Sequence, residues 1–158
     1  MSLETEETDK KSNPLKRRLG DINKEIDWHL TNTGKIVKER LNEHLQPISD
    51  HLPANIIVWE QDMTEEIGDN LVFSIEFNMR NGSLEEVTTQ YRLTDSGCCI
   101  PRRIRTDPLP LSKYPNYAFL VMDRAVELYD EVDQGKIEAG CAMVPQYPSR
   151  IKIELSTY

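Results

Sequence analysis

The stretch LVFSIEFNMRNGSLEEVTTQYRL, residues 71–93, carries two runs of alternating side chains on either side of a glycine-containing turn. Successive side chains of a β-strand point to opposite faces of the sheet, so this alternation predicts strands with one apolar face. In the first run the apolar members are Leu71, Phe73, Ile75, Phe77 and Met79. In the second run the same face is assigned to Val87, Thr89, Tyr91 and Leu93. The stretch therefore predicts a β-hairpin.

The apolar faces also predict the length of the turn. A two-residue turn would place Phe77 opposite Glu86 and would mismatch the two faces. A three-residue turn over residues 81–83 places Phe77 opposite Val87, so that both apolar faces meet the same core. The hairpin is therefore predicted to have the three-residue turn.

Further strands and helices are predicted on both sides of the hairpin. A short strand over residues 56–59 precedes it, a third strand follows the turn at residues 95–97, and residues 151–155 form a final strand. Apolar residues at helical spacing predict an N-terminal helical region up to Pro47 and one long C-terminal helix that ends at Gly135. The N-terminal region is predicted to kink or to divide near Gly34.

This order of elements is typical of an α+β two-layer sandwich, in which helices cover an antiparallel β-meander. Residues 13–158 are expected to form a single domain, and residues 1–12 a disordered tail, because the tail combines charges with few apolar residues. The predicted core is Phe73, Ile75, Phe77, Tyr91, Val121, Ala125 and Leu128. The element order and the pair Tyr114-Pro115 resemble the RWD family of interaction domains, although the second proline of that family's motif would fall at Phe119.

The apolar stripe of the N-terminal helical region is longer than one small sheet can cover. A helix rises about 1.5 Å per residue, so a stripe of some 30 residues spans roughly 45 Å. We therefore predict a homodimer whose interface is built from Leu15, Leu19, Ile22, Ile26, Leu30, Val37 and Leu41.

The stretch GCCIPRRIR, residues 97–105, holds the highest density of reactive and charged groups. Two neighbouring cysteines on a strand point to opposite faces, so Cys98 and Cys99 are not expected to share a metal ion, and with Cys141 they are expected to stay reduced. The arginines have two interpretations: they pair with Glu76 and Glu86 across strands, or they form a surface for an anion or a partner. The predicted surface is Arg80, Arg92, Arg103 and Arg105.

The composition and the absence of known motifs disfavour several classes of function. The net charge of −8 disfavours general binding to nucleic acid or to an anionic membrane, and no apolar run reaches the length of a membrane span. An intracellular, cytoplasmic protein is expected. Nuclear import is the alternative, through the basic cluster Lys10, Lys11, Lys16, Arg17 and Arg18. No catalytic, cofactor-binding or metal-binding motif stands in the sequence.

We therefore predict a non-catalytic interaction module of adaptor or regulatory type that associates with itself and with a protein partner. Two alternatives stay open: an RNA- or anion-binding domain that uses the arginine-bearing sheet face, and a small ligand-binding protein or hydrolase. No cofactor is expected.

Overall fold

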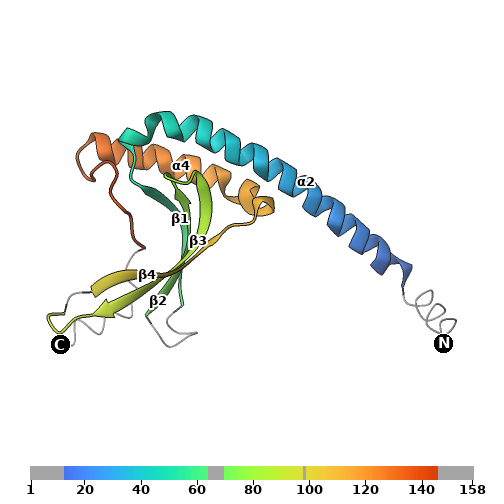
Figure 1. Ribbon diagram of the computed structural model, residues 1–158, viewed down its shortest axis with the longest axis horizontal. Helices are drawn as coiled ribbons and strands as arrows, with labels where there is room; N and C mark the ends of the chain where they lie inside the picture. The colour runs from blue at the N-terminus through green and yellow to red at the C-terminus, as the bar shows by residue number, and fades with distance from the viewer. Residues whose placement is uncertain (1–12, 64–69, 98, 146–158) are drawn as a thin grey trace.

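The computed structural model describes residues 13–63, 70–97 and 99–145, and the predicted tail (residues 1–12) and final strand (residues 151–155) lie outside them. In chain order the elements are α2 (Pro14–Leu45), the 3-10 helix η1 (Gln46–His51), β1 (Asn55–Asp62), β2 (Leu71–Asn78), β3 (Ser83–Leu93), β4 (Cys99–Pro108), the 3-10 helix η2 (Leu111–Lys113) and α4 (Tyr114–Asp133). The predicted α+β class is confirmed: a helix precedes an antiparallel meander, and a second helix follows it (Figure 1).

Helix α2 runs without a break through Gly34, so the predicted kink or division there is wrong. The helix begins where predicted: Pro14 occupies its first turn, and the backbone N–H of Leu15 donates to Asn13 Oδ1 at 3.1 Å. Gly34 is buried, and a β-carbon at this position would lie 1.8 Å from the carbonyl oxygen of Leu111. The glycine therefore serves the close approach of α2 to η2, and does not end the helix.

Within the described residues, four strands form one antiparallel sheet in the order β1-β2-β3-β4. Each strand pairs with its neighbour in the chain, so β1 and β4 are the two edges. Pro101 lies in β4, which confirms its expected place on an edge strand, where a residue without a backbone N–H costs the sheet little.

The predicted register of the central hairpin is wrong. Phe77 lies opposite Leu84, and Val87 lies opposite Ser74. The turn has four residues, Met79–Gly82, and Gly82 has a positive φ of 64°. Because opposed residues share a face, the face of β3 that joins Phe77 in the core carries Leu84, and Val87 and Tyr91 belong to the opposite face.

Side chains from the end of α2 and the start of η1 hold this four-residue turn. Asn42 Nδ2 of α2 donates to the carbonyl oxygen of Gly82 at 2.8 Å, and Gln46 Nε2 of η1 donates to that of Met79 at 2.7 Å. Two carbonyl groups of the turn thus bond to helical residues that lie far away in the sequence. The turn length is set by this tertiary contact as well as by the hairpin itself.

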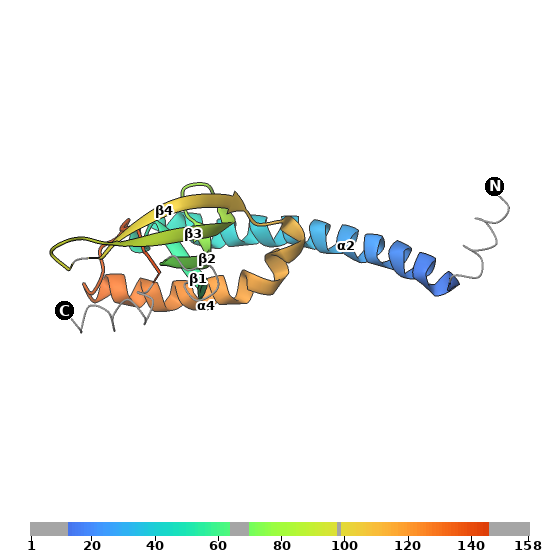
Figure 2. The same cartoon turned by 90° about the horizontal axis from the view of Figure 1, so that it is seen from below.

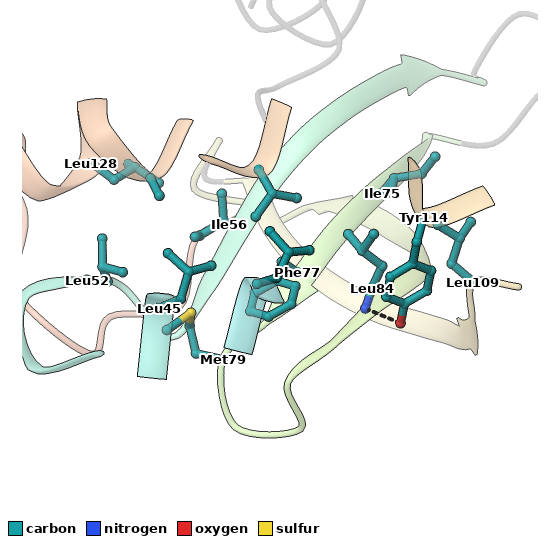
Figure 3. Close-up of a cluster of buried hydrophobic side chains, with 13 residues drawn as sticks. Leu45, Leu52, Ile56, Ile75, Phe77, Met79, Leu84, Leu109, Tyr114 and Leu128 are labelled. Carbon is teal, nitrogen blue, oxygen red and sulfur yellow. Dashed lines mark hydrogen bonds between the residues drawn. The ribbon is translucent and has the colours of Figure 1, made fainter. Parts of the chain in front are cut away.

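The hydrophobic core lies between the two helices and one face of the sheet (Figure 3). Five predicted members are confirmed there, namely Ile75, Phe77, Val121, Ala125 and Leu128, while Phe73 packs at its margin. The Tyr114 hydroxyl accepts a hydrogen bond from the backbone N–H of Leu84 at 2.9 Å. Burial raises the pKa of this hydroxyl above its ordinary value, so it stays a neutral anchor between α4 and β3.

The opposite face of the sheet was expected to be open, but at its centre it is buried. Ser74, Glu76 and Thr89 are each at most 1% exposed. The described end of the chain reaches this face: the side-chain amide of Asn55 exchanges two hydrogen bonds with the backbone of Met143, and the Tyr91 hydroxyl donates to the carbonyl oxygen of Pro145. Tyr91 is therefore buried as predicted, but on this second face.

Candidate interaction surface

The N-terminal half of α2 extends away from the rest of the described protein (Figures 1 and 2). Every residue from Asn13 to Leu30 is exposed, and the buried residues of α2 all lie in its second half. We call residues 14–30 the projecting helix. Its apolar stripe is Leu15, Leu19, Ile22, Ile26 and Leu30, which are 63, 56, 49, 50 and 38% exposed.

Two of the residues predicted to form the dimer interface lie elsewhere. Leu41 is a member of the hydrophobic core, and Val37 is half-buried against that core. They lie where α2 crosses the sheet and α4, so packing within one protomer already covers Leu41 almost completely and Val37 in part. The predicted interface is corrected accordingly to the five residues of the projecting helix.

An apolar groove, here called the α2–α4 groove, begins where the projecting helix ends. Ile36, Val37 and Leu41 line it from α2 together with Arg40 and His44, and Ala118, Phe119 and Met122 line it from α4; its volume is about 280 Å³. Ile36 and Phe119 are 58% and 76% exposed. Neither was predicted as a site residue. The spacing of Ile36, two heptads after Ile22, is a signal that could have identified it, whereas Phe119 carries no such signal.

The four arginines predicted to form one surface do not share a face. Arg103 lies opposite Thr89, on the face that carries Glu76, whereas Arg105 lies opposite Thr88, on the other face. A register shift between Thr88 and Thr89 separates them, because a bulge inserts one extra residue into β4. The two remaining arginines are placed apart from Arg103. Arg92 faces the same side as Arg105, and Arg80 lies in the β2–β3 turn. RNA or anion binding stays a prediction.

Arg103 takes part in a buried polar network, as the structural interpretation of the arginines predicted. Its Nη2 donates to Glu76 Oε1 at 2.7 Å. Asn55 Nδ2 donates to the same oxygen at 2.6 Å, and Ser74 Oγ donates to Oε2 at 2.8 Å. The carboxylate is 1% exposed, so these donors replace the water that it would bind when the chain is unfolded.

Arg103→Ala should therefore destabilise the protein by about 2 kcal/mol, because it leaves a buried carboxylate without its charged partner. Arg105→Ala is the matched control on the same strand, since Arg105 pairs with Asp107 in an exposed position and should cost less than about 1 kcal/mol. Urea unfolding of both variants measures the difference, and equal losses would contradict the role given to Glu76.

The part of the chain that the structure describes includes two free cysteines and a pocket beside β1, whose lining includes Glu60. Cys99 and Cys141 are free thiols there, while Cys98 is not described. No group of three or more His, Cys, Asp or Glu residues in these ranges is placed to hold a metal ion. A pocket of about 390 Å³ lies between β1 and α4, but its described lining, which includes Trp59 and Arg124, holds no serine, threonine, cysteine or histidine.

Comparison of the chain with protein-family models, with curated protein sequences and with solved structures found no match. None of the helices within the described residues combines the length and the apolar character needed to cross a membrane. The geometry of the projecting helix and of the α2–α4 groove is thus the basis for assigning a function.

Proposed function

We propose that this protein is a non-catalytic interaction module that self-associates through the projecting helix. The observation that carries the proposal is the exposure of Leu15, Leu19, Ile22 and Ile26 along one side of a helix whose remaining residues are mostly polar or charged. Their spacings of four, three and four residues are those of the apolar positions in a two-stranded coiled coil. The partner that this pattern fits best is a second copy of the same stripe.

The length of the projecting helix supports the same conclusion. Residues 14–30 span about 25 Å at 1.5 Å per residue. Most of the stability of a helix in a protein comes from packing of its apolar face. Within the described residues the projecting helix is exposed along its whole length, so a second helix along its apolar stripe would supply packing that the described domain does not.

The test replaces Ile22 and Ile26 together with glutamine, a residue that favours helices and keeps the substituted positions uncharged. Each isoleucine contributes about 1.5 to 3 kcal/mol when fully buried, and a dimer contains two copies of each. The dissociation constant should therefore rise by at least about 100-fold. Arg17→Gln with Lys24→Gln is the matched control on the outer side of the same helix and should leave the dimer intact.

Sedimentation equilibrium over the micromolar range measures both variants against the wild-type protein. Both should keep the wild-type domain fold, since all four side chains are exposed in the protomer. A wild-type protein that stays monomeric at high micromolar concentration would defeat the proposal. So would an isoleucine variant that dimerises as tightly as the wild type.

A further inference from the structure

The apolar stripe of the projecting helix continues past the point where the domain begins. Steps of seven residues lead from Leu15 through Ile22 and His29 to Ile36. Two turns of an α-helix take close to seven residues, so these side chains lie along one side of α2. Ile36 is 58% exposed, whereas the adjacent Val37 packs against the core. The seam that starts at Leu15 therefore ends at the wall of the α2–α4 groove.

The α2–α4 groove combines a cavity with an exposed aromatic side chain, Phe119, of a size that such a cavity can hold. Its volume is about 280 Å³, and cavities of about 150 Å³ already hold a benzene ring. Phe119 stands at its wall with 76% of its surface exposed. A two-fold interface uses the same patch on both subunits. A patch that carries both the hollow and the ring meets this requirement, because each ring can enter the groove of the other copy.

A dimer held by the projecting helix alone would be small. Residues 14–30 contain little more than two heptads, whereas lasting coiled coils usually have at least three or four. Stable interfaces bury about 1,200 to 2,000 Å², and one aromatic side chain contributes about 150 to 250 Å². After Ile26 the next two seam positions are the polar residues His29 and Thr33, and Ile36 is the first apolar seam position after them. Ile36 and two Phe119 rings would enlarge the interface. A parallel pair brings these residues together at the two-fold axis, whereas an antiparallel pair leaves them uncovered at opposite ends.

We propose that the dimer is parallel and in register, and that Phe119 of each protomer packs into the α2–α4 groove of the second copy. This inference rests on the self-association proposed above and extends the interface from the helix onto the domain. The two domains then lie side by side at the same end of the helix pair.

Disulfide formation tests the orientation, in a background where the three native cysteines are replaced by serine. Ile36→Cys should form a covalent dimer under mild oxidation, because a parallel two-fold pair brings the two positions within the Cα separation of about 4.4 to 6.8 Å that a disulfide needs. Lys35→Cys is the control, since this exposed neighbour points to another side of the helix. A mixture of Leu15→Cys and Ile26→Cys chains should form disulfides only between like chains, whereas an antiparallel pair would form the mixed disulfide that joins a Leu15→Cys chain to an Ile26→Cys chain.

The second measurement tests the groove itself. Phe119→Asp should raise the dissociation constant of the dimer by about 30-fold, because it places a charge in an apolar contact. Val126→Asp is the matched control: Val126 is 62% exposed, lies two turns further along α4 and does not line the groove. Its effect should stay within about threefold. Circular dichroism should show unchanged folds, since both side chains are exposed.

The outcomes separate this inference from the function on which it rests. A monomeric wild-type protein overturns both. A wild-type dimer that Ile22→Gln with Ile26→Gln disrupts, but that Phe119→Asp leaves unchanged, overturns the inference alone. A mixed disulfide between the Leu15→Cys and Ile26→Cys chains, without cross-linking of Ile36→Cys, overturns it in the same way and leaves self-association standing.

Discussion

Replacing Gly34 with alanine should destabilise the protein by about 3 kcal/mol, although alanine is the better helix former by about 1 kcal/mol. The added β-carbon would lie 1.8 Å from the carbonyl oxygen of Leu111 and 2.6 Å from its carbonyl carbon. Both are backbone atoms, so no side-chain rotation relieves the contact. Helix α2 and the turn η2 must move apart, which loosens the packing of Leu41 and Leu45 in the core.

Gly20→Ala is the matched control for this prediction, because it makes the same change in the same helix. A β-carbon at Gly20 meets nothing within 4 Å, so the variant should be neutral or more stable by up to about 1 kcal/mol. Urea unfolding at one fixed protein concentration measures both, since self-association makes apparent stability depend on concentration. Equal stabilities for the two variants would show that α2 and η2 separate without cost.

Phe77→Ala should cost about 3 to 5 kcal/mol, the range found when a fully buried phenylalanine is truncated. Phe77 is 0% exposed and lies directly between Ile56 and Leu84 on the neighbouring strands. Helices α2 and α4 close the core above this face (Figure 3). The variant loses the free energy gained by burying the ring, and it also carries the cost of the cavity that the ring leaves. The strands on both sides prevent the core from closing around that cavity.

Phe73→Ala provides the comparison on the same strand and face. Phe73 is half-buried and contacts Trp59 edge-on, with ring centroids 5.8 Å apart. Its truncation should cost about 1 to 2 kcal/mol, because much of the ring already meets water and no closed cavity forms. Chemical denaturation ranks the two variants, and a larger loss for Phe73 would contradict the position assigned to the core.

The elements were predictable because their apolar periods are long and regular. Leu71 to Phe77 alternate over a whole strand, and Val121, Ala125 and Leu128 recur at helical spacing. The continuity of α2 at Gly34 was not predictable, because glycine is a common helix stop and only the position of Leu111 shows why it stands inside this helix.

The predicted register of the hairpin was wrong for a different reason. Matching apolar faces assumes that only one face of the sheet is buried, but Val87 and Tyr91 are buried on the face that also carries Glu76. When both faces of the sheet are buried, an apolar residue of β3 can lie on either face. Matching the apolar residues of the two strands then no longer determines the register. Arg103 and Arg105 were placed on one face for a separate reason: residues two apart in a regular strand share a face, and the bulge in β4 breaks that rule.

The candidate interface was partly predictable. The stripe from Leu15 to Leu30 is visible in the sequence, and its exposure agrees with the expectation that some of it remains for a partner. The position at which α4 crosses α2 decides which apolar residues of α2 stay exposed. The heptad spacing after Ile22 points to Ile36, which stays exposed, but only the position of α4 shows that Leu41 enters the core.

The consecutive order of the strands has a consequence for how the chain folds. Each strand pairs with its neighbour in the chain, so little chain entropy is lost in closing each hairpin, and the sheet can form one hairpin after another. Helix α2 joins by longer closures, since Asn42 meets a turn 40 residues away. We therefore expect α2 to dock after the hairpins have formed, so that the projecting helix is anchored on a sheet that already exists. If the apolar stripe of a newly made chain paired with a second copy before α2 had docked, the sheet of that chain would still have to form afterwards.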